Sequence, residues 1–211
     1  MAVKLPNGAT VHIATTYDAA KPVASNAVEA VLTVTGHGFN DGDFVLLESG
    51  WGKLNERVFQ IGGKTNDTFK LVGVDTSDVD VYPAGGGKGS VKRITGWTQI
   101  PQIIEFSTSG GEQQFVDFGF LEDDYEQQIP STQSALSITV KIADDPSLSG
   151  YKAVAKASDA GGKTPLRLVL KGGGQIVYNG YPSLNKTPEM TRNQIMAVTL
   201  AYAVSGPAAR Y

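Results

Sequence analysis

Short runs of alternating apolar and polar residues dominate the chain, and glycine, proline, asparagine or aspartate bounds most of them. Such runs predict half-buried strands, because successive side chains of a strand point to opposite faces. The clearest run is residues 135–143 (ALSITVKIA), whose alternating apolar positions are Leu136, Ile138, Val140 and Ile142. Residues 193–204 (NQIMAVTLAYAV) predict a long final strand. The pattern as a whole indicates a largely β protein.

The predicted strands fall into two groups. The first group comprises residues 29–35, 44–47, 57–61, 68–72 and 90–94, with turn-rich connections such as TGHGFNDGD. Short strands joined by tight turns are typical of a small barrel or sandwich. We therefore expect an inserted small β-barrel at residues 28–94, preceded by a linker at residues 17–27. The main domain then comprises residues 1–27 and 95–211.

The second group predicts a β-sandwich with one helix. Its further strands are expected at residues 9–15, 103–107, 113–120, 165–171 and 175–181. Asp145 is a candidate helix cap, and Pro146 suits the first helical position because its missing N–H needs no partner there. Apolar residues at helical spacing follow on one face: Leu148, Tyr151, Val154 and Ala155. The expected fold class is all-β with one helix.

Residue composition excludes several kinds of chemistry. The chain of 211 residues contains no cysteine, so it has no disulfide, thiolate metal site or cysteine nucleophile. Its net charge is -3, and lysine and arginine are scattered, whereas proteins that grip nucleic acid usually carry a basic patch. Two isolated histidines, His12 in a strand and His37 in a turn, favour structural roles over a metal site. We expect no metal and no cofactor.

Three polar segments imitate functional motifs without completing them. The run GGGKGS lacks the Ser or Thr that must directly follow the lysine of a phosphate-binding loop. Asp75, Asp78 and Asp80 lack the order of ligands of a calcium loop. Residues 122–131 (EDDYEQQIPS) are acidic and aperiodic, and catalytic carboxylates need a shaped site that separates their pKa values. The sequence therefore predicts that the protein is not an enzyme.

Membrane insertion is not expected from the hydropathy pattern. No stretch approaches the run of about 20 apolar residues that spans a bilayer. The beginning, MAVKLPNGAT, reaches proline and asparagine before any apolar region develops, which is unlike a signal peptide. We expect synthesis in the cytoplasm and no membrane partner.

The first group of strands resembles a known small β module. Its run contains Gly-His-Gly, then Gly-Asp, then Leu-Asn before a strand, then Asp-Thr-Phe; here these are residues 36–38, 42–43, 54–55 and 67–69. This order is similar to the first catalytic cysteine half-domain of ubiquitin-activating enzymes, a module that recurs as an insertion in phage structural proteins. The ubiquitin chemistry does not carry over, because the chain has no cysteine. The resemblance implies a decoration that points outward.

The remainder resembles the tail tube family of long-tailed phages (siphophages), the group that contains the lambda major tail protein. The resemblance rests on residues 96–112, on 141–147 (KIADDPS), on the hairpin at 165–183 and on a long final strand to Gly206. It implies a virion protein whose hexameric rings stack around a tape-measure protein, with tail terminator and tail tip proteins as further partners. Each subunit would contribute strands to one inner β-barrel, through which DNA passes without specific binding.

The resemblance also implies which residues carry assembly. The barrel strands would be marked by Leu136, Ile138, Val140, Ile142, Ile195, Ala197, Thr199 and Ala201. A loop between stacked rings would comprise Glu122, Asp123, Asp124, Tyr125, Glu126, Ile129 and Pro130. Because this loop is acidic and aperiodic yet has apolar anchors, we expect it to be mobile in the free subunit and ordered between rings.

Other functions remain open at this point. A carbohydrate- or host-surface-binding phage module is the main alternative, since Trp51 and Tyr82 lie near turns and aromatic side chains on loops can stack on sugars. A tube of a secretion system would share the fold, so fold alone does not separate it from a phage tail. A hydrolase lacks candidate residues.

Overall fold

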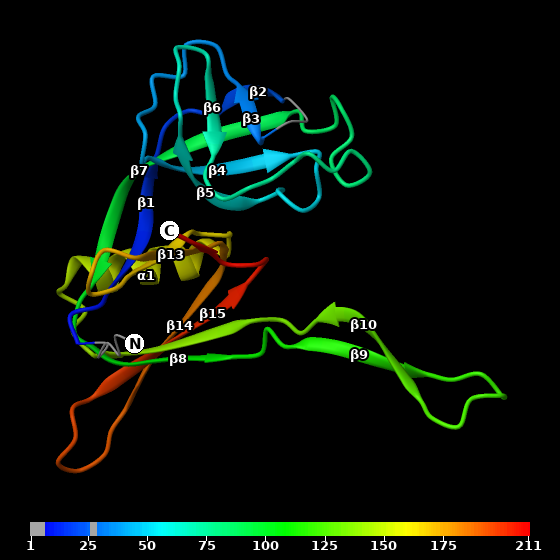
Figure 1. Ribbon diagram of the computed structural model, residues 1–211. Coiled ribbons are helices and arrows are strands. Elements are labelled where there is room, and N and C mark those ends of the chain that lie inside the picture. Colours follow the sequence, from blue (N-terminus) through cyan, green and yellow to red (C-terminus); the bar gives the residue numbers. More distant parts are fainter. Residues whose placement is uncertain (1–6, 26–28) are drawn as a thin grey trace.

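The computed structural model describes residues 7–25 and 29–211, and it comprises a barrel, a sandwich and a projecting arm (Figure 1). The expected features of residues 1–6, and the expected domain border between residues 27 and 28, lie outside the described residues. Within the part that is described, no helix is long and apolar enough to cross a membrane.

The barrel is a closed ring of antiparallel strands. Its strands are β2 (Lys21–Ser25), β3 (Val31–Thr33), β4 (Phe44–Ser49), β5 (Arg57–Gly62), β6 (Thr68–Leu71) and the first part of β7 (Gly89–Ile100). Pairing of β4 with β7 closes the ring, so each barrel strand has a paired neighbour on both sides over at least part of its length. Its core is aromatic and fully buried around Trp51, Phe59 and Phe69. The inserted β-barrel expected from the sequence is confirmed as a fold.

The N-terminal border of the barrel differs from the sequence prediction. Residues 17–27 were expected to be a linker, but β2 lies there and pairs with β3 and β7. Pro22 makes this strand difficult to predict from the sequence, because proline cannot donate a ladder hydrogen bond. It is accommodated because Pro22 pairs with Ser90 of β7 and with no residue of β3, so one side of β2 has no partner at this position.

Strand β7 connects the barrel to the sandwich. Its second part pairs with β1 (Thr10–Tyr17), which continues through β12 (Leu166–Val169) and β13 (Gln175–Tyr178) to β16 (Ala209–Arg210). Arg93 bridges the two regions by binding Asp18 at 2.8 Å and Asp43 at 3.2 Å. Because one strand runs through both regions, a break at residues 94 and 95 falls inside a strand.

A second sheet completes the sandwich. Its order is β14 (Gly180–Glu189), β15 (Ala197–Val204), β11 (Ser137–Ala143) and β8 (Ile103–Ser109). The two sheets bury a common core that includes Ile13, Ile138, Val140, Val198, Leu200 and Tyr202. Burial of such side chains supplies roughly 1.5–3 kcal/mol each. The expected all-β fold with one helix is confirmed for the described residues.

The helix α1 (Ser149–Ala160) begins later than the sequence predicted. Leu148 occupies the cap position and no side chain caps the helix, so the capping role expected of Asp145 is wrong. The Asp145 carboxylate instead accepts hydrogen bonds from the Ser147 amide at 3.0 Å and hydroxyl at 2.6 Å, in a turn before the helix. The first helical turn lies against β7, since a Cβ on Gly150 would be 2.3 Å from the Gln99 carbonyl oxygen.

The arm extends the hairpin of β8 and β11 away from the body (Figure 1). It consists of β9 (Gln113–Phe118) and β10 (Gln127–Gln133), which pair only with each other. The hairpin bends at Gly110 and Gly111, whose φ angles are 81° and 83°. A Cβ on Gly110 would lie 2.1 Å from the Ala135 carbonyl oxygen, so this bend requires glycine.

Candidate functional site

The outer face of the four-stranded sheet is small and polar. It is built from the residues that alternate with the buried ones on all four strands, and cross-strand pairing places them in rows: Ser107, Thr139, Ala201 and Ser183 form one row, and Ser109, Ser137, Ala203 and Tyr181 form the next. Most of these side chains are exposed. We call this surface the polar face.

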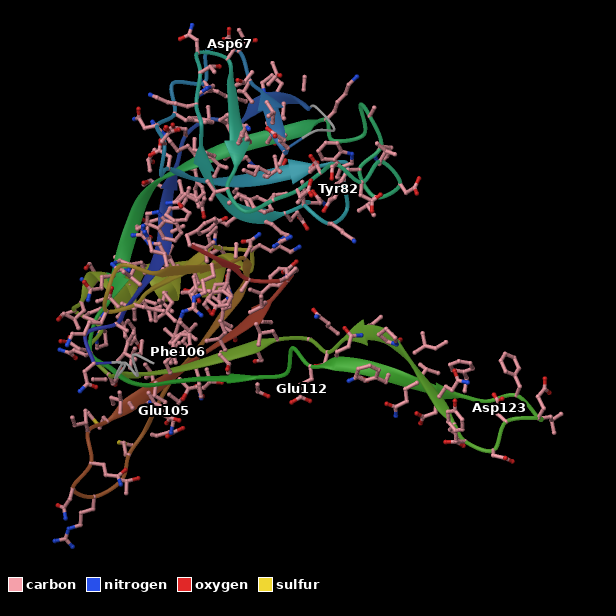
Figure 2. All side chains as sticks on the ribbon, in the orientation of Figure 1. Asp67, Tyr82, Glu105, Phe106, Glu112 and Asp123 are labelled. Carbon is pink, nitrogen blue, oxygen red and sulfur yellow. The ribbon has the colours of Figure 1, made fainter. Side chains whose placement is uncertain are left out.

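One end of the polar face carries its charges. Lys141 lies between Glu105 and Thr199 across the strands, and its Nζ binds Glu189 at 2.9 Å. Hydrogen bonding to Glu189 raises the pKa of Lys141, so the lysine stays charged at neutral pH. Figure 2 places Glu105 on β8, at this end of the sheet. The polar face therefore combines small neutral side chains with one lysine and two glutamates at its end, and it has no basic patch.

The expected barrel-strand residues divide between the two faces of this sheet. Ile138, Val140 and Ile142 point into the sandwich core and are at most 2% exposed. Thr199 and Ala201 lie on the polar face, and Ala197 lies at its end, nearly covered. The corresponding inward residues of β15 are Val198, Leu200 and Tyr202, which the sequence analysis did not select.

Two of the expected barrel positions lie outside strands. Ile195 was expected within a strand over residues 193–204, but β15 begins at Ala197 and Ile195 is 72% exposed in the preceding turn. Leu136 directly precedes β11 and packs against the sandwich core. Alternation alone extended both strands too far, because a turn residue can match the period by chance.

The four-stranded sheet has two different edges. In the chain as described, β8 pairs only with β11 and its other edge is open along its length. The first half of β14 is partly covered, since the Leu184 amide donates to Ser158 Oγ of α1 and the Gly180 carbonyl accepts from Thr164. The second half of β14 is exposed. Open edges present unpaired N–H and C=O groups that another chain can pair.

The arm exposes an apolar surface. Pairing of β9 with β10 places Val116, Phe118 and Ile129 on one face, and Phe115 and Pro130 on the other. Phe115, Val116 and Ile129 are each more than half exposed. A two-stranded hairpin alone is marginally stable in water. The arm therefore has apolar groups to bury, and nothing in the described part of its own subunit buries them.

The expected loop at residues 122–131 is wrong in its second half. Ile129 and Pro130 belong to β10, so the connection between the arm strands comprises only residues 119–126. Glu122, Asp123, Asp124, Tyr125 and Glu126 lie in this connection, which we call the arm tip. Pro130 concealed the strand, but it is tolerated because β10 has a partner on one side only.

The arm tip combines acidic and apolar side chains. Its sequence, GFLEDDYE, contains four carboxylates and no basic residue. Phe120, Leu121 and Tyr125 are 64%, 106% and 72% exposed. The Asp123 carboxylate accepts a hydrogen bond from the Phe120 amide at 3.1 Å, which closes a compact turn. Figure 2 shows Asp123 at the far end of the arm, away from the body.

The polar motifs dismissed from the sequence have structural roles. His37 is buried between turn glycines, and its Nδ1 accepts a hydrogen bond from the Phe39 amide at 2.9 Å. Asp75 and Asp78 each accept a backbone hydrogen bond within their own turns. Among the described residues, no three His, Cys, Asp or Glu side chains are placed to hold a metal ion.

The aromatic pair that favoured sugar binding belongs to the barrel interior. Trp51 is 2% exposed, and its Nε1 donates a hydrogen bond to the Pro83 carbonyl at 3.0 Å. Tyr82 packs edge-on against Trp51, with ring centroids 5.4 Å apart. Since the face of Trp51 is covered, it offers no platform for a sugar ring.

These surfaces define a protein that works by association: a sheet with an open edge, a polar face and an apolar arm. The phage tail tube protein family matches residues 49–211, which is most of the chain. The chain belongs to this family. It is a structural subunit of a phage tail tube, located in the tail of the virion and assembling with copies of itself, and it is not an enzyme.

Two solved structures are similar to the chain in fold. One is the tail of an empty gene transfer agent particle, reconstructed by helical refinement with C6 symmetry; it has 14% identity and a TM-score of 0.45, over 55% of this chain and 87% of that one. The other is the virion of a native gene transfer agent particle, with 13% identity and a TM-score of 0.44, over 55% and 88%. No curated protein matches the chain.

Proposed function

We propose that the four-stranded sheet is the wall element of the tube and that its polar face lines the channel. In this arrangement a hexameric ring joins the sheets of neighbouring subunits, edge to edge, into one continuous barrel. The observation that carries the proposal is the combination of an open β8 edge with a polar face opposite a buried apolar one. Closing such sheets into a barrel removes the open edges.

The chemistry of the polar face suits passage of DNA. A wall that gripped phosphates would slow the polymer, because phosphate contacts dominate affinity for nucleic acid. Here the wall offers serine, threonine and alanine, and its lysine is compensated by Glu189. We therefore propose that DNA moves through the channel without specific binding. A tape-measure protein inside the tube, and terminator and tip proteins at its ends, are the further partners we propose.

We propose that the arm links one ring to the next. Its exposed apolar residues would be buried on a neighbouring subunit, which also explains how a hairpin of marginal stability persists in the tube. Because its apolar residues would also be buried on the neighbouring subunit, we propose that the arm tip becomes ordered on assembly. We also propose that the tube is that of a siphophage in particular.

The barrel is proposed to be a peripheral decoration. Its core is separate from the sandwich core, which supports two units. Because β2 (Lys21–Ser25) is a barrel strand and Val23 belongs to the barrel core, the proposed barrel unit begins at β2 and not at the expected residue 28. A third cluster, which includes Phe44, Ile94 and Trp97, lies between the two cores. A variant that lacks the barrel would expose the residues of this cluster that remain in the sandwich, so it must carry polar residues in their place. The likeness to the ubiquitin-activating half-domain stays a prediction from sequence.

Thiol labelling of assembled tubes tests the channel assignment, because the chain has no cysteine of its own. Ala201→Cys places a thiol on the polar face, and Val79→Cys places one on the barrel, where Val79 is 62% exposed. In the free subunit both thiols should react with a maleimide carried on a large polymer. In tubes, Cys at 201 should react with a small reagent only, while Cys at 79 reacts with both.

Two outcomes contradict the assignment. Equal labelling of both positions by the large reagent in tubes would place the polar face outside. Protection of position 201 from the small reagent as well would mean that this face is buried in a contact between subunits. Negative-stain electron microscopy establishes that each variant has formed tubes.

A further inference from the structure

A groove of about 470 Å³ lies between the barrel and helix α1. Ala14 of β1, Leu46 of β4 and Ala157 of α1 supply apolar lining, and Lys92, Lys156 and Lys163 also line it. We call it the lysine groove. It differs from the hollow at the charged end of the polar face, which is lined by Glu105 and Glu189 against a single lysine, Lys141.

Both apolar and basic side chains line the lysine groove. Ala153 and Ala157, one helical turn apart on α1, keep side chains short along it. Lys92 is held by Glu48 at 2.9 Å, and Lys163 by Glu56. Lys156 is exposed, and within the described ranges it forms no ion pair. An occupant that suits this groove carries apolar side chains together with negative charge.

The arm tip has that chemistry. Its exposed apolar residues are Phe120, Leu121 and Tyr125, and they are interleaved with four carboxylates. Its turn is already closed by the hydrogen bond from the Phe120 amide to Asp123, so less conformational entropy is lost on docking. The arm points away from α1 of its own subunit (Figure 1), so a tip that fills a lysine groove comes from another copy.

We propose that the arm tip of one subunit docks in the lysine groove of a subunit in the adjacent ring. The apolar tip residues cover Ala157 and Leu46, while the carboxylates face Lys156 and its neighbouring lysines. The hollow at the polar face is a poorer receptor, because Glu105 and Glu189 repel an acidic tip. This inference rests on the proposed link between rings and names the two surfaces that form it.

Disulfide trapping between two single-cysteine variants tests the contact directly. Subunits with Leu121→Cys are mixed with subunits carrying Ala157→Cys, assembled and oxidised; the chain supplies no competing thiol. Covalent dimers of the two variants should form in tubes and not among unassembled subunits. Val79→Cys in place of Ala157→Cys is the control, since Val79 is exposed on the barrel away from the groove. Normal tubes without dimers between positions 121 and 157 would overturn the proposal.

Charge reversal provides an independent test that needs no cysteine. Lys156→Glu should slow tube elongation on the order of tenfold, because a rim charge acts chiefly on the rate of association. Asp124→Lys in the same chain should restore elongation, since the pair is then reversed. Lys152→Glu is the matched control: it is an exposed lysine of the same helix that does not line the groove. Thermal unfolding of each free subunit shows that the fold is kept.

Removal of residues 120–125 separates this inference from the proposed function. Loss of tubes on removal, with no effect of Lys156→Glu, means that the arm links rings through another surface, and the groove assignment is overturned. Normal tubes on removal overturn both the link between rings and the groove. Loss of tubes on removal, together with slower elongation of Lys156→Glu that Asp124→Lys restores, supports both.

Discussion

The barrel and the arm are built from the same kind of antiparallel strands, and they differ in where their apolar side chains go. The barrel closes on itself, so each of its strands pairs with a neighbour on both sides, and it buries Trp51, Phe59 and Phe69. The arm has one pair of strands and exposes most of its apolar residues. Burial within the subunit therefore stabilises the barrel, whereas the arm has apolar surface left for another chain.

The largest effect is expected from the barrel core. Trp51→Ala should lower the free energy of unfolding of the free subunit by about 3–5 kcal/mol, because a buried aromatic ring is lost and a cavity remains. Phe115→Ala, its counterpart on the arm, should change stability by no more than about 0.5 kcal/mol and should impair tube formation. Denaturant unfolding and electron microscopy measure the two. Equal losses of stability would contradict the comparison.

A smaller effect is expected where the arm leaves the sandwich. Gly110→Ala should cost about 1–3 kcal/mol, because the residue has a φ of 81° and its new Cβ would clash with the Ala135 carbonyl. Gly52→Ala is the control, since nothing lies within 4 Å of a Cβ added there. Denaturant unfolding of the free subunit measures the difference. A Gly110→Ala subunit as stable as the control would show that the bend tolerates a side chain.

Hydrogen exchange sharpens the contrast without any substitution. Amides of β9 and β10 should exchange at least about tenfold more slowly in tubes than in the free subunit, which corresponds to about 1.4 kcal/mol. Amides of β4 and β5 should exchange slowly in both states, because the barrel is closed in each. The same arm exchange rate in both states would mean that the arm stays free after assembly.

The smallest effect is expected at the turn before α1. Hydrogen bonds from the Ser147 hydroxyl and amide hold the pKa of Asp145 below its ordinary value. Since the folded pKa is lowered, the stabilisation is complete above the ordinary pKa of the unfolded chain and is lost as pH falls through the folded value. Asp145→Ala should therefore cost less than Gly110→Ala, because the side chain is only half-buried and caps no helix. An NMR titration that finds an ordinary pKa for Asp145 would contradict the expected stabilisation by its hydrogen bonds to Ser147.

Alternation along the chain is enough to define its local β pattern. Alternation placed the barrel strands β4, β5 and β6, and it identified β11 with its buried Ile138, Val140 and Ile142. Alternation depends on one physical fact, that successive side chains of a strand point to opposite faces. The same fact already implied that Thr139 and Lys141 share the other face, and this was the available signal for the polar face.

The positions of the strands that contain proline, and the strand edges that stay open, depend on long-range pairing in the tertiary structure. Strands β2, β10 and β14 contain Pro22, Pro130 and Pro182, and each tolerates proline because a neighbouring strand is missing on one side there. That condition depends on residues distant in sequence, so no local pattern reveals it. The passage of β7 through both regions and the meeting of β1, β4, β7 and α1 at the lysine groove are likewise set by long-range pairing and packing.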